Sequence, residues 1–520
     1  MANGDTASAE KDLAMQPAPV IASPGAEYAP ETRVFQGIPG VERAPKGRLW
    51  ATWYGGGPTE GPWNYVMLVT SADDGETWSD LKLVIDPPGD VRTFDPCLWV
   101  DPEGRMWLFY AQAWDLWDGR GGVWAIVTDE PDAEDPSWSA PRRLCDGVMM
   151  NKPVALSTGE WLLPAAVWAN PPMIRDETHR FSPEDSSGSN AVCSTDKGAT
   201  WALRGGCDIP ARTCDEHHIV ERHDGTLWTL ARTLYGIGES FSADGGRTWS
   251  PGKPSWIPHV PHARFFIRRL ASGKLLLVKH SPPAQDTRSH LTAYLSDDDG
   301  ATWYGGLLLD ERRGVSYPDG VQAPDGAIYL IYDYSRYAAK QILMSVFTQE
   351  DVVAGECVSD RARLRVLVNQ ATGETPLRQF ELSDNADGIP LITDEPADIE
   401  PVEGELDTLR AEATLFTNRA YTALPLPELL DGASFVRSSI DSDDVVCARA
   451  GIMYVITPLA HRNRDSVELQ LLRKGFRKAS VPEFMLFGQA EGNICSVFQK
   501  QVQAKEELKL GKWGIIVTPK

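Results

Sequence analysis

The sequence has no paired cysteines and no long apolar run. Its eight cysteines are scattered over 520 residues without a C-x-x-C pair, which excludes a zinc ribbon or a thioredoxin-like redox site. No run of about 18 apolar residues occurs, so no membrane-spanning helix is expected. The first 20 residues contain neither a basic n-region nor an apolar h-region. We therefore expect no signal peptide and predict a cytoplasmic protein, with secretion left open.

Basic residues are fewer than acidic ones. The chain has 50 Lys and Arg residues against 73 Asp and Glu residues, which gives a net charge of −23 and a pI near 4.8. Such a surface repels phosphate groups and anionic lipid heads, so neither nucleic acid nor a membrane is an expected partner. An anionic substrate would need a local basic pocket. The sequence carries no signature of an oligomeric state.

A repeated turn dominates the chain. Turn-forming and aromatic residues are abundant, with 45 Gly, 38 Pro and 18 Trp, as in proteins built from many short strands. One octapeptide occurs four times, and a degenerate copy lies at 128–138. The four copies are SADDGETW (71–78), STDKGATW (194–201), SADGGRTW (242–249) and SDDDGATW (296–303). The Ser and Asp oxygens can accept backbone N–H groups and the Gly permits a positive φ, so each copy predicts a β-hairpin corner covered by its Trp.

The spacing of these corners predicts a propeller. The copies recur roughly every 50 residues, which is the size of one four-stranded blade. Five copies and the strand-like residues from 314 to 346 give six blades. We therefore predict an all-β chain with an N-terminal extension (1–30), a six-bladed β-propeller (31–352), a connecting segment (353–405) and a smaller C-terminal β-rich accessory domain (406–520). Carbohydrate binding, dimerisation and simple packing are the roles open to the accessory domain, and simple packing is the expected one.

The octapeptide resembles the Asp box (BNR repeat) of sialidases, also named neuraminidases, and the resemblance covers roughly residues 34–352. The segment EHHIVERHDGTLWTLAR (216–232) is similar to the sialidase segment that ends in the second arginine of a carboxylate-binding triad, here Arg232. In that family the leading Glu, here Glu216, assists the nucleophile. Arg288 lies where the third triad arginine is expected. Tyr317 follows an Asp box as the sialidase nucleophile does, and Asp95 before a proline is similar to the Asp that contacts the amide side of the sugar.

The resemblance implies a retaining exo-glycoside hydrolase that removes a terminal acidic sugar, sialic acid or a relative, from glycans. The anomeric carbon of a sialoside already bears a carboxylate, so a neutral Tyr317 hydroxyl meets less repulsion there than a carboxylate nucleophile would. Glu216 would take the Tyr317 proton, and Arg232 and Arg288 would hold the substrate carboxylate. His217 would line the pocket and donate hydrogen bonds to sugar hydroxyls. No metal or cofactor is expected.

Two positions depart from the family pattern. Sialidases open with an Arg-Ile-Pro motif, whereas this chain has Gly37 in place of that arginine. Help for the substrate carboxylate is then expected from Arg92 or Arg264. The family's general acid is an Asp in the loop of the first blade, where Glu60 is the carboxylate available here.

Two other functions stay open at this point. A polysaccharide lyase on the same propeller would use His217 or His218 with Tyr317 to abstract a proton beside a uronate carboxylate. A non-catalytic glycan-binding propeller would keep the pocket without turnover, and loss of the opening arginine is typical of such a protein.

Overall fold

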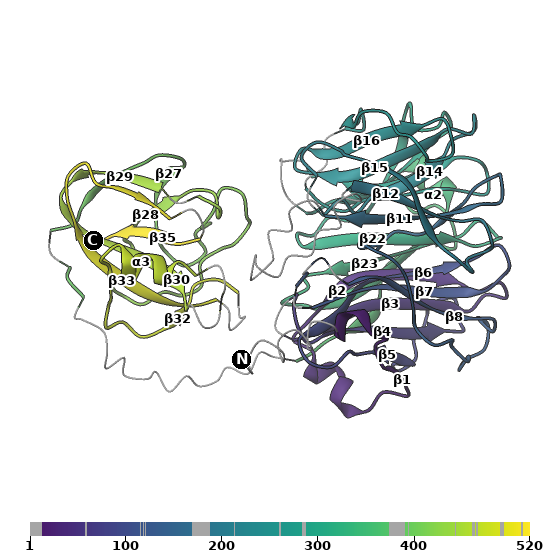
Figure 1. Ribbon diagram of the computed structural model, residues 1–520, viewed down its shortest axis with the longest axis horizontal. Helices are drawn as coiled ribbons and strands as arrows, with labels where there is room; N and C mark the ends of the chain where they lie inside the picture. The colour runs from purple at the N-terminus through teal and green to yellow at the C-terminus, as the bar shows by residue number, and fades with distance from the viewer. Residues whose placement is uncertain are drawn as a thin grey trace, which may run out of the picture. The chain divides into compact units, whose positions relative to one another are not determined.

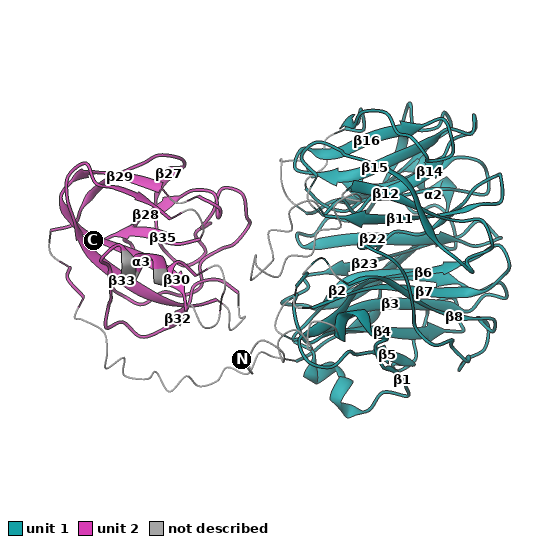
Figure 2. Cartoon of the chain, in the orientation of Figure 1, with its two compact units in different colours: residues 1–373 teal, residues 374–520 magenta. Residues whose placement is uncertain are grey.

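Strands are the main secondary structure of the chain, which forms two compact units, residues 1–373 and 374–520 (Figure 1, Figure 2). The computed structural model describes residues 13–57, 60–114, 116–117, 119, 121–168, 188–212, 214–258, 262–282, 288–373, 391–393, 395–442, 444–459, 463, 466–488, 493–510 and 513–520. Within these ranges no helix is long and apolar enough to cross a membrane. The predicted all-β class is confirmed.

Unit 1 contains six consecutive antiparallel sheets within its described ranges, each built from strands in chain order. The sheets are β2 (Phe35–Arg43), β3 (Leu49–Gly56), β4 (Asn64–Ser71) and β5 (Leu83–Ile85); β6 (Val91–Val100), β7 (Met106–Trp114), β8 (Gly122–Thr128) and β9 (Arg142–Cys145); β10 (Val154–Ala155), β11 (Trp161–Val167), β12 (Gly188–Ser194) and β13 (Ala202–Cys207); β14 (His218–Glu221), β15 (Leu227–Thr233), β16 (Gly236–Ser242) and β17 (Lys253–Pro254); β18 (Phe266–Arg269), β19 (Leu275–His280), β20 (Leu291–Ser296) and β21 (Tyr304–Asp310); and β22 (Val315–Gln322), β23 (Ile328–Tyr334), β24 (Gln341–Phe347) and β25 (Arg363–Gln370).

The first strands of the sheets lie beside one another around a common axis. β2 contacts both β6 and β22, β14 contacts β10 and β18, and β18 contacts β22. The first and sixth sheets are also joined by hydrogen bonds. Asp333 Oδ2 accepts from the Ile38 N–H at 2.8 Å, and Asp319 Oδ2 accepts from the Val41 N–H at 3.0 Å. The series of sheets therefore closes on itself in a propeller-like arrangement, with β2 near β22 and β23 in Figure 1.

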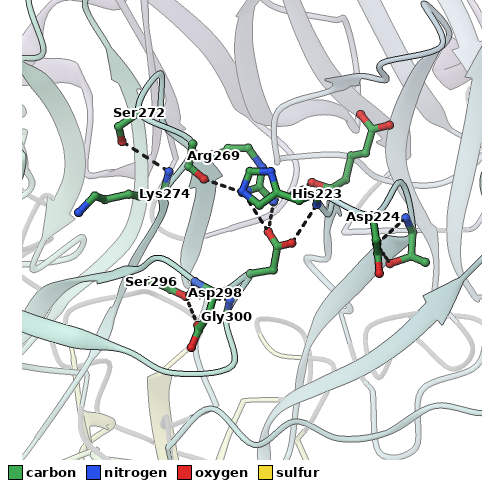
Figure 3. Close-up of polar contacts among 12 residues, drawn as sticks. His223, Asp224, Arg269, Ser272, Lys274, Ser296, Asp298 and Gly300 are labelled. Atoms are coloured by element: carbon green, nitrogen blue, oxygen red, sulfur yellow. Dashed lines mark hydrogen bonds and ion pairs between the residues drawn. The ribbon is translucent and has the colours of Figure 1, made fainter.

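Each Asp box forms the corner between the third and fourth strands of its sheet. In all four copies the Ser Oγ donates to the Asp Oδ1 at 2.8 Å. The Thr Oγ1 donates to the other carboxylate oxygen in each copy. Figure 3 shows the fourth box, where the Ser296 hydroxyl points to Asp298. The next residue, Asp299, accepts from the His223 N–H of the fourth sheet and from Arg269 of the fifth. The box corner therefore also ties neighbouring sheets together.

The sheets of unit 1 extend beyond the predicted propeller at both ends. Before its predicted start, β1 (Val20–Ala22) pairs with β5 as an edge strand of the first sheet, among the short turns η1 (Leu13–Met15), η2 (Ala26–Tyr28) and η3 (Pro30–Thr32). After its predicted end, β25 forms the outer strand of the sixth sheet. Helix α2 (Gln349–Ala354) joins β24 to β25 in place of an Asp box. Because the sequence repeat is missing at that corner, the sequence placed the boundary too early.

Unit 2 is β-rich and has an apolar core of its own. Its first strand begins within the predicted connecting segment. One sheet has the order β26 (Asp398–Pro401), β29 (Asp444–Arg449) and β34 (Glu507–Lys509); the other has β27 (Glu405–Thr408), β28 (Ser434–Arg437), β35 (Ile515–Thr518), β30 (Gly451–Pro458), β33 (Ile494–Val502) and β31 (Arg477–Lys478), with β32 (Phe484–Met485) also paired to β33 and a short helix α3 (Glu468–Arg473).

Candidate active site

Three of the axial strands carry the same backbone distortion. Ile38 in β2, Asp95 in β6 and Tyr317 in β22 each precede a proline and have φ values of +56°, +48° and +53°. At each place two residues of the axial strand lie opposite one residue of the next strand, which defines a β-bulge. A bulge re-aims a side chain away from the regular alternation of a strand. The sheets therefore use one local device to redirect these three positions.

Tyr317 and Glu216 meet in a buried hydrogen-bonded cluster. The Tyr317 hydroxyl donates to Glu216 Oε1 at 3.1 Å. Arg232 Nη1 lies 2.5 Å from the same oxygen and 3.3 Å from the Tyr317 hydroxyl. Tyr317 is 7% exposed and Glu216 is 6% exposed. The Arg232 backbone N–H donates to the Asp215 carbonyl at 2.7 Å, which keeps the arginine next to the glutamate. The structure thus brings together the three residues that the sequence predicted as nucleophile, base and carboxylate ligand.

Burial keeps the Tyr317 hydroxyl neutral. Loss of solvent raises the pKa of Tyr317 well above its ordinary value, and the Glu216 charge raises it further, while Arg232, Arg288 and Arg336 act in the opposite direction. A phenol in this setting becomes a nucleophile only as its proton moves to a neighbouring base. Glu216 Oε1 already accepts that proton's hydrogen bond, so the geometry suits general-base activation.

Three guanidinium groups surround Tyr317, and the sequence predicted two of them. Beside Arg232, the Arg288 Cζ lies 5.5 Å from the centre of the Tyr317 ring, and Arg288 Nη1 donates to the Ser316 hydroxyl at 3.1 Å. The Arg336 Cζ lies 5.1 Å from the same ring centre. The site therefore gathers three guanidinium groups around one tyrosine, two of which pair with the carboxylates of Glu216 and Glu60.

Arg336 occupies the space beside Gly37. A Cβ atom at Gly37 would lie 2.3 Å from Arg336 Cδ, so no larger residue fits there unless Arg336 moves. Arg336 Nη1 donates to Glu60 Oε1 at 2.7 Å, and Arg336 Nε lies 3.9 Å from Asp333 Oδ2. The sequence analysis did not predict Arg336, because this residue follows β23 in a segment that matches no recognisable motif. The local signal was the glycine itself, which leaves room for a side chain from elsewhere.

Asp95 is a buried carboxyl group with a raised pKa. It is 4% exposed. Burial raises the pKa of Asp95 to about 8, the charges of Glu216 and Glu60 act in the same direction, and Arg92 and Arg264 oppose them. Asp95 therefore holds a proton at neutral pH and can donate it. Glu60, which the sequence suggested as general acid, is held by Arg336 and is partly exposed.

His217 and Arg264 are enclosed, and each is hydrogen-bonded to the protein. His217 Nε2 bonds to the Asn190 carbonyl at 2.9 Å, and burial lowers the pKa of His217 to about 4. Arg264 Nε donates to Asn151 Oδ1 at 2.8 Å, and its Nη2 donates to the Met150 carbonyl at 3.0 Å. Each of the two is 1% exposed. Both were predicted to bind substrate. That role stays a prediction: Nδ1 of His217 has no hydrogen-bond partner among the described residues, whereas Arg264 Nε and Nη2 are bonded inside the protein.

No group of three or more His, Cys, Asp or Glu side chains is arranged to hold a metal ion in the part of the chain that the structure describes. The candidate site is accordingly one of hydroxyl, carboxyl and guanidinium groups.

A BNR repeat-like domain matches residues 41–330. The match covers more than half of the chain, and the chain belongs to this family. It confirms the resemblance to Asp-box proteins of the sialidase type. No curated protein matches the sequence.

Several solved structures are similar to this chain. A Dyadobacter fermentans protein of unknown function has 16% identity, with 64% of this chain and 98% of that chain covered and a TM-score of 0.48. A Hadza microbial sialidase has 19% identity, with 62% and 67% covered and a TM-score of 0.48. A leech intramolecular trans-sialidase has 15% identity, with 65% and 71% covered and a TM-score of 0.48.

Proposed function

We propose that the chain is a sialidase-like exo-glycoside hydrolase on a six-bladed β-propeller, which removes a terminal acidic sugar from glycans and retains its anomeric configuration. The observation that carries the proposal is the buried Tyr317–Glu216 hydrogen bond beneath three guanidinium groups. Three guanidinium groups around one tyrosine can together donate charged hydrogen bonds to the carboxylate of an acidic sugar.

The reaction divides into two displacements. In the first, the Tyr317 oxygen forms a bond to the anomeric carbon as the bond to the aglycone oxygen breaks, and the Tyr317 proton passes to Glu216. The aglycone oxygen takes a proton from a carboxylic acid, for which Asp95 is better suited than Glu60 because Asp95 stays protonated to about pH 8. In the second, water replaces Tyr317 at the same carbon and gives a proton to the Asp95 carboxylate left by the first step, while Glu216 returns its proton to the Tyr317 oxygen.

The arginines supply the selectivity for an acidic sugar. Arg232, Arg288 and Arg336 can each donate charged hydrogen bonds to a carboxylate, worth about 1.5–3 kcal/mol apiece. Arg336 takes over the task of the arginine that Gly37 replaces, because its side chain fills the space above that glycine. The lyase alternative is less well supported, since His217 and His218 each bond a backbone carbonyl and are enclosed.

The test is release of a fluorescent aglycone from an α-sialoside by the wild type, Tyr317→Phe and Tyr329→Phe. We expect the wild type to turn over, and Tyr317→Phe to lose roughly 100-fold or more in kcat because its nucleophilic oxygen is gone. Tyr329→Phe is the matched control. It also removes a phenol hydroxyl from the sixth sheet, one that donates to Asp74, and should retain activity.

In the same assay Arg336→Ala should raise KM about 10- to 100-fold, the loss of one charged hydrogen bond to the carboxylate. Arg361→Ala, a partly exposed arginine, should leave KM unchanged. A wild type that cleaves no α-sialoside would overturn the proposed substrate. Full activity in Tyr317→Phe would overturn the mechanism.

A further inference from the structure

A buried side-chain amide, that of Asn151, is hydrogen-bonded to the backbone at Glu216. Asn151 lies three residues before β10 and is 1% exposed. Its Nδ2 donates to the backbone carbonyl of Glu216 at 2.7 Å and to that of His217 at 2.9 Å. Its Oδ1 accepts from Arg264 Nε at 2.8 Å. One side chain of the third sheet therefore holds the backbone of the fourth sheet at the residue that accepts the Tyr317 proton.

Arg264 continues this connection to the strand that carries Tyr317. Arg264 Nη2 lies 3.7 Å from Asp319 Oδ1. Asp319 follows Tyr317 by two residues and closes its β-bulge. The other oxygen of Asp319 accepts from the Val41 N–H at 3.0 Å. A chain of contacts, Asn151 to Arg264 to Asp319, thus joins the backbone at Glu216 to the backbone at Tyr317 and involves segments of four sheets.

Both ends of this connection are conformations that need support. Glu216 has φ +47° and Tyr317 has φ +53°, values at which a residue with a side chain costs about 1–2 kcal/mol relative to ordinary backbone. Such conformations persist when surrounding contacts hold them. The hydrogen bond between the two side chains, 3.1 Å long, depends on both backbones keeping their places, because the residues belong to the fourth and sixth sheets.

We propose that Asn151 and Arg264 are positioning residues that hold Glu216 and Tyr317 at reacting distance. They touch neither substrate nor the reacting atoms and act through the backbone of the pair. The proposal rests on the proposed function only in taking Glu216 and Tyr317 as the reacting pair. It also explains why Arg264, which the sequence analysis expected to bind substrate, is buried.

The decisive variant is Asn151→Asp. It keeps an oxygen for Arg264 and has nearly the same shape, but at neutral pH it has no N–H to donate to the two carbonyls. We expect kcat on the α-sialoside to fall about 10- to 100-fold with KM within about threefold of the wild type, because a small displacement of reacting groups costs that much in rate. Asn151→Ala should likewise lower kcat and leave KM nearly unchanged.

Gln112→Glu is the matched control. Gln112 is fully buried in the second sheet, and its Nε2 likewise donates to backbone carbonyls, those of Ala14 and Gln16. Replacing it should lower the melting temperature and leave kcat unchanged. An equal fall of kcat in both variants would overturn the proposal, since it would reveal a general effect of a lost buried amide.

Crystal structures of the wild type and Asn151→Asp separate this proposal from the proposed function. We expect the distance from the Tyr317 hydroxyl to Glu216 Oε1 to exceed hydrogen-bonding range in the variant. If that distance stays near 3.1 Å, Asn151 does not position the pair, whatever the substrate is. If the distance lengthens while α-sialosides are not cleaved even by the wild type, the positioning stands and only the substrate assignment fails.

Discussion

At the scale of single residues, Asp95 shows how the fold sets the chemistry of a group. The bulge in β6 turns Asp95 into the interior, where burial raises its pKa to about 8. An unfolded aspartate has a pKa of about 3.9. Between these two values the folded state binds a proton that the unfolded state releases. The free energy of unfolding therefore falls as pH rises from about 4 through 8.

Asp95→Asn removes that titration. We expect the variant to gain stability relative to the wild type as pH rises from 5 to 8, by up to about 4 kcal/mol, because an amide needs no proton to stay neutral. Chemical unfolding at several pH values measures this. Asp196→Asn is the control: hydrogen bonds from Thr200 lower the pKa of Asp196 to about 2, so its effect should be constant over the same range. A constant effect of Asp95→Asn would contradict the assignment.

Single residues were predictable from the sequence where a short segment carried them. Tyr317, Glu216 and Arg232 each lie in a recognisable segment, and the structure brings them together. Arg336 and Asn151 were not predictable in this way. The place of Arg336 depends on empty space at Gly37, about 300 positions earlier in the chain, and the role of Asn151 depends on two carbonyls in another sheet. Such relations exist only in the closed ring of sheets.

At the scale of elements, the Asp box packs each sheet against the one before it. A Cβ atom on the box glycine would clash with the preceding sheet, at less than 3.0 Å, in three boxes: Gly198 against Trp107, Gly300 against Trp228, and Gly75 of the first sheet against Met344 of the sixth. The glycine is therefore required both for its positive φ and for close approach of the next sheet. The sequence repeat indicated the hairpin corner correctly, but it did not show which residues of the preceding sheet the glycine packs against.

Gly300→Ala and Gly104→Ala separate these two requirements. Both glycines have φ +85°, so each alanine should cost about 1–2 kcal/mol for its backbone conformation. A Cβ at Gly300 would lie 2.6 Å from the Trp228 ring, whereas nothing lies within 4 Å at Gly104. Gly300→Ala should therefore lose about 1–3 kcal/mol more, as measured by urea unfolding. Equal losses of stability in the two variants would show that the close contact between the sheets at Gly300 does not contribute to stability.

At the scale of the whole molecule, one ammonium group joins four sheets at the axis. Lys152 of the third sheet donates to the carbonyls of Val41 and Leu98, in the first and second sheets, at 2.6 and 2.7 Å. It also pairs with Glu42 at 3.1 Å and with Asp319 of the sixth sheet at 3.2 Å. The apolar pattern of the strands predicted the sheets, while this polar centre could not be read from any one of them.

Lys152→Met should destabilise unit 1 by about 3–5 kcal/mol, because it leaves Glu42 buried without its cation and Asp319 with Arg264 alone, 3.7 Å away. Lys82→Met is the matched control, since Lys82 also pairs with two acidic residues, Glu134 and Asp135, but at the surface. Its loss should stay within about 1 kcal/mol. Thermal unfolding followed by tryptophan fluorescence reports on unit 1. Comparable losses of stability in the two variants would show that Lys152 contributes no more to the stability of the fold than a surface lysine does.

The bulges of β2, β6 and β22 have a consequence for how such a site changes over time. In each strand the hydrogen-bonded ladder resumes on both sides of the distortion, so the redirected residue is exchangeable without loss of pairing. An isoleucine, an aspartate and a tyrosine now occupy the three equivalent places. A substitution at any of the three changes the side chain that the bulge redirects, while the strand pairing on either side of it stays in place.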